Sequence, residues 1–168
     1  MTSALATPRS GPRAQTDHDP ETVRLRLKPK APATGSVDGG WWPRSWDLAA
    51  ELPDLLAVLA VRLGRIERVS YHLGEWGDTV HKVGVDGRLV RLDGFRTQHA
   101  NTVDVLSARE RITLLVVPPE MSEHAAHAAL MTAAHRGNTD DVESMLVDRT
   151  GSDAAADTDT RPTQGEQE

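Results

Sequence analysis

Four tryptophans against one tyrosine and one phenylalanine are the most unusual chemical feature of this chain. Trp41, Trp42 and Trp46 lie close together, and Trp76 lies in a glycine-flanked turn. A tryptophan offers a broad flat face and one N–H donor, which suits it to hold a planar ligand or anchor a partner. Arg44 adds forked donors that can bind a carboxylate or a phosphate. The alternative is core packing, although neighbouring Trp41 and Trp42 cannot both face inward on an extended segment.

Residues 93–101 form the second candidate for a binding surface. The segment contains Gly94 and is rich in hydrogen-bonding side chains, and such loops on a sheet scaffold often carry binding residues. The alternative is that these side chains only satisfy a chain crossover. We expect a small-molecule or protein-binding surface built from Trp41, Trp42, Arg44, Trp76, Arg96 and Asn101.

The competing hypothesis is a small acid–base enzyme. Alternation places Ser70 and His72 on one face of an expected strand, where Asp104 of a later strand can approach them. A histidine oriented by a carboxylate is the usual general base, although such residues are also common on a solvated sheet face. In this hypothesis the catalytic candidates are His72 or His99, acting with Asp78, Asp93 or Asp104.

Metal and cofactor chemistry have little support in the sequence. His124, His127 and His135 fall on one arc of an expected late helix, but no further ligand is placed to complete a metal shell. We interpret them as a solvent-facing stripe and expect no metal. The chain has no cysteine, no phosphate-binding glycine loop and no zinc-protease motif, and we expect no cofactor.

The elements that must position these residues follow from periodicity. Leucines at three- and four-residue spacings from Leu48 to Leu63 predict an amphipathic helix, with Pro53 near its start. Asp86-Gly87 between two apolar segments predicts a hairpin. Strands are expected at 23–27, 65–73, 79–85, 88–92, 102–106 and 111–117, and late helices at 122–136 and after Thr139. We predict an α+β fold, a mostly antiparallel sheet of five to six strands with one early and two late helices packed on one face.

Length and composition predict a single domain, residues 21–149, between disordered tails at 1–20 and 150–168. The net charge is −6, and residues 138–168 hold nine acidic and two basic groups, a net of −7. Residues 31–137 hold thirteen acidic and eleven basic groups, a net of −2, so we expect no nucleic-acid partner. The longest apolar run, 55–61, is too short to span a membrane, and residues 1–19 lack a secretory signal. We expect a cytoplasmic protein.

The chain resembles an actinobacterial family of small proteins known only as a domain of unknown function. The resemblance spans about residues 22–147, and the Gly-Gly-Trp-Trp-Pro-Arg-Ser string at 39–45 is its most specific part. It implies a single cytoplasmic domain and carries no activity, cofactor or partner. The segments that carry the resemblance are 25–29, 37–45, 71–78 and 92–104.

Overall fold

The computed structural model describes residues 23–30, 34–77 and 80–147. The two expected tails and Asp78 lie outside the described residues. The fold is α+β, as the sequence predicts, with seven strands and three helices within the described part of the chain. No helix there is both long enough and apolar enough to cross a membrane.

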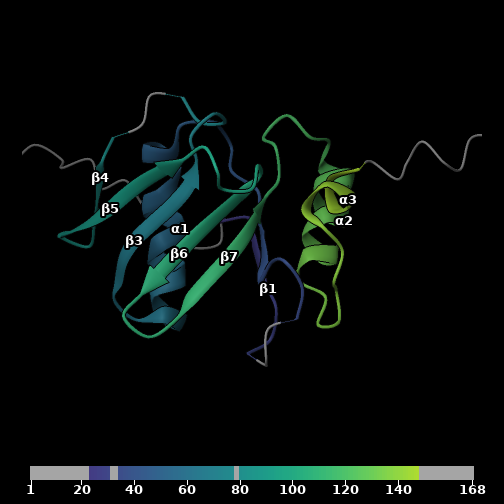
Figure 1. Ribbon diagram of the computed structural model, residues 1–168, viewed down its shortest axis with the longest axis horizontal. Coiled ribbons are helices and arrows are strands. Elements are labelled where there is room, and N and C mark those ends of the chain that lie inside the picture. Colours follow the sequence, from purple (N-terminus) through teal and green to yellow (C-terminus); the bar gives the residue numbers. More distant parts are fainter. Residues whose placement is uncertain (1–22, 31–33, 78–79, 148–168) are drawn as a thin grey trace, which may run out of the picture.

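All the strands belong to one mixed sheet, whose order is β1-β2-β7-β6-β3-β5-β4 (Figure 1). The β2–β7 and β3–β5 pairs are parallel, and the other neighbours are antiparallel. The expectation of five to six mostly antiparallel strands is therefore only roughly matched. The strands are β1 (Leu25–Leu27), β2 (Gly39–Trp41), β3 (Ile66–His72), β4 (Lys82–Val85), β5 (Arg88–Phe95), β6 (Thr102–Ser107) and β7 (Arg111–Val116).

Helix α1 (Leu48–Leu63) follows directly from its apolar stripe. Its six buried residues are the leucines whose spacing predicts the helix, and they lie in one core with the inner face of the sheet. The Asp47 side chain accepts a hydrogen bond from the Ala50 backbone N–H, which caps the N-terminus. Pro53 is accommodated inside the helix, so the first turn is continuous with the rest.

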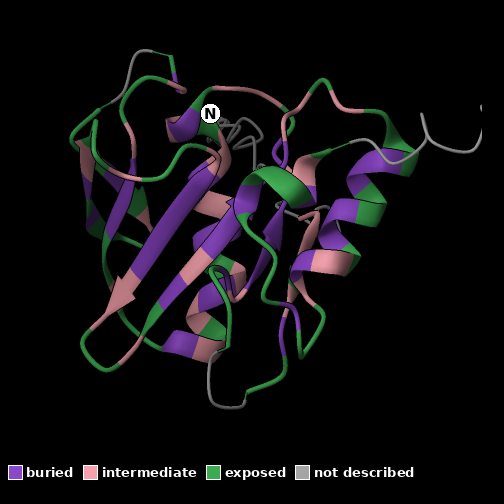
Figure 2. Cartoon of the chain, turned by 45° about the vertical axis from the view of Figure 1, so that its right-hand side comes forward, coloured by how far each residue is buried: buried purple, intermediate pink, exposed green. Residues whose placement is uncertain are grey.

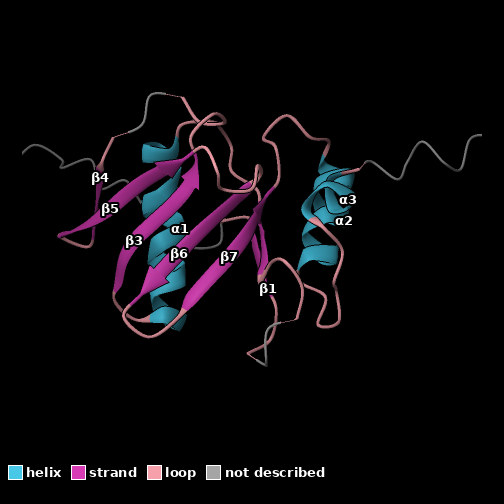
Figure 3. Ribbon diagram, in the orientation of Figure 1, coloured by secondary structure: helices cyan, strands magenta, loops and turns pink. Residues whose placement is uncertain are grey.

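Helices α2 (Glu123–Ala133) and α3 (Val142–Leu146) pack on the sheet face opposite α1. Figure 1 shows α1 on one side of β3–β7, with α2 and α3 beside β1 on the other. The prediction that all helices share one face is wrong. Asp141, rather than Thr139, caps α3. Figure 3 shows that no helix covers β3, β5 and β6 on the α2 side, so this part of the face stays open.

Strand β2 explains the two-sided arrangement, and the sequence analysis missed it. Trp41 points into the core shared with α1, and Gly40 faces α2. A Cβ at Gly40 would lie 2.9 Å from Leu130 Cδ2 and 3.2 Å from Ala133 Cβ. The missing side chain therefore lets α2 pack directly on the backbone of the strand.

The buried residues form two apolar clusters, one on each face of the sheet (Figure 2). The larger cluster contains the leucines of α1 and the strand residues that face this helix. The smaller contains three alanines and Leu130 of α2, together with Val37, Leu115, Val117, Val142 and Met145. Because α2 contributes mostly small side chains to this cluster, the helix lies close to β1 and β2.

Candidate functional site

A groove of about 730 Å³, lined by polar and apolar side chains, runs between β1 and α2. Its volume lies within the range of small-molecule sites. Arg24, Arg26 and Trp42 line it on the sheet side, and His124 and His127 line it on the helix side. Basic and aromatic groups from two distant segments therefore meet in one groove.

Arg24 is held in a fixed position at the sheet end of this groove. Its guanidinium carbon lies 3.6 Å from the centroid of the Trp42 ring. Nε donates to the Trp42 carbonyl at 3.0 Å, and Nη2 donates to the Pro43 carbonyl at 2.7 Å. A guanidinium has five N–H donors, so three of them make no hydrogen bond to any described residue. Arg24 is thus oriented by the fold before any ligand binds.

Trp42 is half-buried and is itself fixed by two bonds. Its backbone N–H donates to the Arg24 carbonyl at 2.9 Å, and its indole Nε1 donates to the Pro118 carbonyl at 3.2 Å. The first bond continues the β1–β2 ladder, and the second ties the ring to the segment that leads into α2. The ring therefore forms a rigid wall of the groove.

The groove carries an excess of positive charge. Glu123 is its one acidic lining residue, and neither Arg24 nor Arg26 forms an ion pair with any carboxylate in the described ranges. Burial lowers the pKa of the Arg24 guanidinium, and the charge of Arg44 lowers it further, whereas Glu51 and Glu123 act in the opposite direction. Arg24 is thus partly desolvated and forms no ion pair with a carboxylate of the described residues.

The other tryptophans belong to the core and not to this groove. Trp41 and Trp76 are 2% and 6% exposed and stack with ring centroids 5.8 Å apart. Trp46 meets Trp76 edge-on at 5.3 Å and donates from Nε1 to Glu120 at 3.1 Å. The expected single aromatic surface is therefore not assembled, because alternation along β2 sends Trp41 and Trp42 to opposite faces of the sheet.

Arg44, Arg96 and Asn101 do not line the groove. Arg44 is exposed, and its backbone N–H donates to Glu51 Oε2 at 3.1 Å near the start of α1. Arg96 is exposed on the loop after β5. Asn101 adopts a left-handed conformation, with φ of 56°, and its backbone N–H donates to Glu75 Oε1 at 2.6 Å. That geometry gives Asn101 a structural role, since asparagine tolerates this conformation better than most residues.

The acid–base candidates are only partly brought together. His99 and Asp104 line a second hollow, on the open sheet face, but no hydrogen bond joins a histidine side chain to a carboxylate in the described part. Asp104 instead accepts from Thr113 Oγ1 at 2.6 Å and from Arg111 Nη2 at 2.7 Å. His72 Nδ1 accepts from the Gly74 backbone N–H at 3.3 Å.

The remaining carboxylate partners are also engaged elsewhere. Asp93 pairs with Arg68 and Arg91, both at 3.1 Å. Glu75, which the sequence analysis did not single out, is partly buried, and its Oε2 has no partner within the described residues. Burial raises the pKa of the Glu75 carboxyl, while the Asn101 N–H and His72 act against the shift. Neither arrangement presents a histidine and a carboxylate to the same substrate atom.

The histidines of the late helix are exposed. Neither His124 nor His127 has a third metal-ligating group beside it, and the described ranges contain no cluster of three histidine or acidic side chains that could hold a metal ion. His124 and His127 line the groove instead, and His135 lies beyond the end of α2.

Comparison with family models matches residues 24–133, well over half of the chain, to a family of unknown function, DUF5994. The chain belongs to the DUF5994 family. Comparison with curated proteins and with solved structures gave no significant match. The matched segment of this DUF5994 member runs from Arg24, at the start of the groove, to Ala133, at the end of α2.

The sequence analysis missed Arg24, the best-positioned residue of the groove. The alternation of Arg24, Arg26 and Lys28 is typical of the solvent-facing side of an edge strand, and β1 does lie at the edge of the sheet. At that edge β1 pairs with β2, and the pairing brings Arg24 beside Trp42, 18 residues away. The signal was the alternation itself, since it places Arg24 and Arg26 on one face of the strand.

Proposed function

We propose that this protein is a binding module for a small organic anion, a carboxylate or a phosphate ester, which binds in the groove between β1 and α2. The observation that carries the proposal is the Arg24 guanidinium. It is stacked on Trp42 and anchored by two carbonyl groups, without a carboxylate partner in the described part of the chain.

The charge of the lining supports an anionic ligand. Arg24 and Arg26 lie on the same face of one strand, and His124 and His127 face them across the groove as further N–H donors. A guanidinium matches the geometry of a carboxylate or phosphate, to which it can donate two parallel hydrogen bonds. An anion would also offset the desolvation that burial imposes on Arg24.

The apolar part of the lining supports an organic ligand over a bare inorganic ion. The Trp42 ring and the Leu130 side chain line the groove beside the charged groups. Burial of apolar ligand surface against them would add affinity, roughly 25 cal/mol per Å². We therefore propose that the anionic group contacts the arginines and that the carbon skeleton packs on Trp42 and Leu130.

A thermal-shift comparison of benzoate with benzamide tests this proposal, since the two differ mainly in charge. We expect benzoate to raise the unfolding temperature and benzamide to have a much smaller effect. A ligand present at about 100 times its Kd stabilises the folded state by roughly 2.7 kcal/mol. Inorganic phosphate in the same assay measures how much of the effect comes from charge alone.

Arg26→Gln is the decisive variant, because Arg26 is exposed and makes no side-chain hydrogen bond among the described residues. Arg88→Gln, an equally exposed arginine on β5, is the matched control. The proposal predicts that Arg26→Gln weakens the benzoate shift and that Arg88→Gln leaves it unchanged. Equal shifts for benzoate and benzamide, or equal effects of the two variants, would contradict it.

A further inference from the structure

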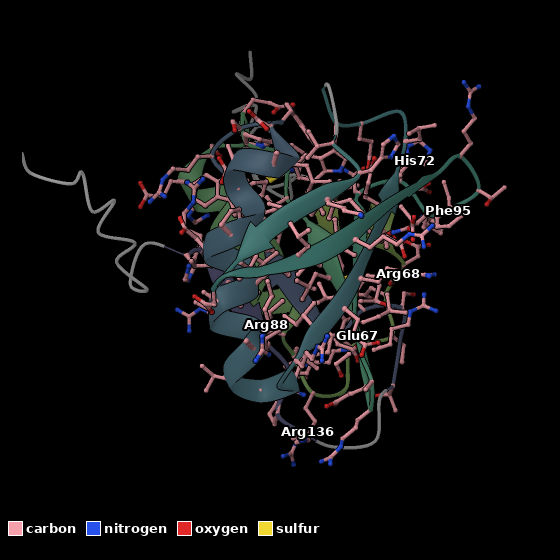
Figure 4. The ribbon with its side chains drawn as sticks, turned by 90° about the vertical axis from the view of Figure 1, so that its left-hand side faces the viewer. Glu67, Arg68, His72, Arg88, Phe95 and Arg136 are labelled. Carbon is pink, nitrogen blue, oxygen red and sulfur yellow. The ribbon has the colours of Figure 1, made fainter. Side chains whose placement is uncertain are left out.

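The open face of the sheet holds a second hollow, of about 480 Å³, separate from the groove. Its floor is a row of polar residues on adjacent strands, in which Ser70 pairs with Asp104 and Asp104 pairs with Thr113. Its rim includes Gln98 and Phe95. Figure 4 shows Phe95 together with Arg68 and His72 on the side of the sheet away from α1.

The hydroxyl of Ser70 is available to a ligand in the hollow. Ser70 is 9% exposed and lines the hollow, and its side chain makes no hydrogen bond to any described residue. The hydroxyl oxygen is not enclosed by protein, so solvent or a ligand can reach it. Ser70 therefore presents both a donor and an acceptor to whatever occupies the hollow.

Gln98 presents a second fixed group. Its Nε2 donates to the carbonyls of Ser70 at 3.0 Å and Thr102 at 3.2 Å, which fixes the amide plane. The amide oxygen, Oε1, makes no hydrogen bond within the described residues and is an acceptor. Thr102, which is 4% exposed, donates to the His99 carbonyl at 2.6 Å and holds the loop in place.

The charges in this hollow are already balanced, unlike those of the groove. The Asp104 carboxylate forms an ion pair with Arg111 Nη2 at 2.7 Å and accepts a hydrogen bond from the Thr113 hydroxyl at 2.6 Å. His99 also lies near enough to Asp141 to contribute to the lowered pKa of that carboxyl, after the dominant hydrogen bonds from Ser144. The lining thus favours a neutral ligand with many hydrogen-bonding groups.

Phe95 supplies an apolar face at the rim. Its side chain is unusually exposed for an aromatic residue, at 47%. The face of an aromatic ring carries negative potential and attracts polarised C–H groups. A sugar ring offers such C–H groups on one face and hydroxyls along its edge, which is the combination that Phe95, Ser70 and Gln98 would contact.

We propose that the hollow on the open sheet face binds a neutral polyhydroxylated ligand of the saccharide or polyol class. Ser70 and Gln98 bond its hydroxyls, Asp104 accepts from one of them with a remaining lone pair, and Phe95 packs against its C–H face. The site is separate from the groove between β1 and α2, because the two share no lining residue.

Saturation-transfer NMR with trehalose, maltose, cellobiose and myo-inositol at millimolar concentrations tests this site. We expect at least one of the four to receive saturation from the protein, with the strongest transfer to protons of one ring face. Ser70→Ala should weaken binding about tenfold, the effect of losing one buried hydrogen bond. Absence of transfer to all four compounds would overturn the proposal.

Phe95→Ala and Leu89→Ala form the matched pair that locates the ligand. Both residues are exposed apolar side chains of β5, and Leu89 lies at the other end of the strand, away from the hollow. We expect Phe95→Ala to abolish the transfer and Leu89→Ala to leave it intact. Transfer that survives Phe95→Ala but is lost in Arg26→Gln would place the sugar in the groove and overturn this assignment while leaving the groove itself a binding site.

Discussion

The guanidinium of Arg24 lies 3.6 Å above the ring of Trp42, and its Nε donates to the backbone carbonyl of the same tryptophan. The contact joins strand β1 to the segment that follows β2, and the Trp42 indole then joins this pair to Pro118. One residue thus stabilises the edge of the sheet and presents charge to the groove.

Arg24→Lys should separate this structural role from charge. Lysine keeps the positive charge but cannot donate two bonds in the fixed geometry of a guanidinium. We expect the free energy of unfolding, measured in urea, to fall by about 1–3 kcal/mol. Arg26→Lys, two residues away on the same face, should change it by less than about 0.5 kcal/mol. Equal losses of unfolding free energy in the two variants would show that the Arg24 hydrogen bonds do not stabilise the fold.

Gly40→Ala should weaken the packing of α2 on the sheet. The new Cβ would meet Leu130 Cδ2 at 2.9 Å and Ala133 Cβ at 3.2 Å, so the helix must shift. Overpacking of this kind lowers the free energy of unfolding by about 1–3 kcal/mol. Gly84→Ala, where a Cβ meets nothing within 4 Å, is the control and should be neutral or slightly stabilising. If Gly40→Ala leaves the free energy of unfolding unchanged, the packing of α2 does not require a glycine at position 40.

Asp104→Ala should lower stability more than Asp93→Ala, although both carboxylates lie on the open sheet face. The Asp104 side chain is 10% exposed and accepts from both Thr113 and Arg111. Its removal should lower the free energy of unfolding by about 1–3 kcal/mol. Asp93 pairs with two arginines whose side chains are 47% and 64% exposed, and such pairs contribute about 0–1 kcal/mol. Chemical denaturation of both variants decides the order.

Glu75 should make stability depend on pH. Burial raises the pKa of its carboxyl in the folded state, so the folded state holds this proton more tightly than the unfolded state. The stability that protonated Glu75 contributes is therefore present at low pH and is lost as the pH rises through the raised value.

Glu75→Gln should remove that dependence. Between about pH 4 and pH 7, we expect the wild type to lose stability relative to Glu75→Gln, measured by urea unfolding at each pH. Glu67→Gln, at an exposed position of β3, should follow the wild type. Parallel curves for the wild type and Glu75→Gln would show that the Glu75 carboxyl is not perturbed.

The elements that the sequence predicts are those whose own side chains carry the pattern. The leucine stripe of α1 and the Asp86-Gly87 turn, with φ of 49° and 74°, both form as expected. Strand β2 was not predicted because Gly39 and Gly40 have no side chains to alternate. It is defined by its partners, β1 and β7, which a single sequence does not place beside it.

The residues around Trp42 show the same limit. The sequence analysis grouped Trp42 with Arg44, two residues away, whereas Trp42 lines the groove and Arg44 does not. The arginine that contacts Trp42 is Arg24, which the β1–β2 pairing supplies. Similarly, the sequence predicts Ser70 and Asp104 on one face of the sheet. That Thr113 lies beside Asp104 follows only from the register of β6 against β7.

The indole N–H signals of the four tryptophans test anion binding in the groove most directly. In a ¹H–¹⁵N spectrum, Trp42→Phe assigns the Trp42 signal, and benzoate is then titrated into the wild-type protein. We predict that the Trp42 signal shifts saturably, while those of the buried Trp41 and Trp76 stay in place, and that Arg26→Gln weakens the response. A Trp42 signal that does not move, or that moves equally with benzamide, would contradict an anion site at Arg24 and Trp42.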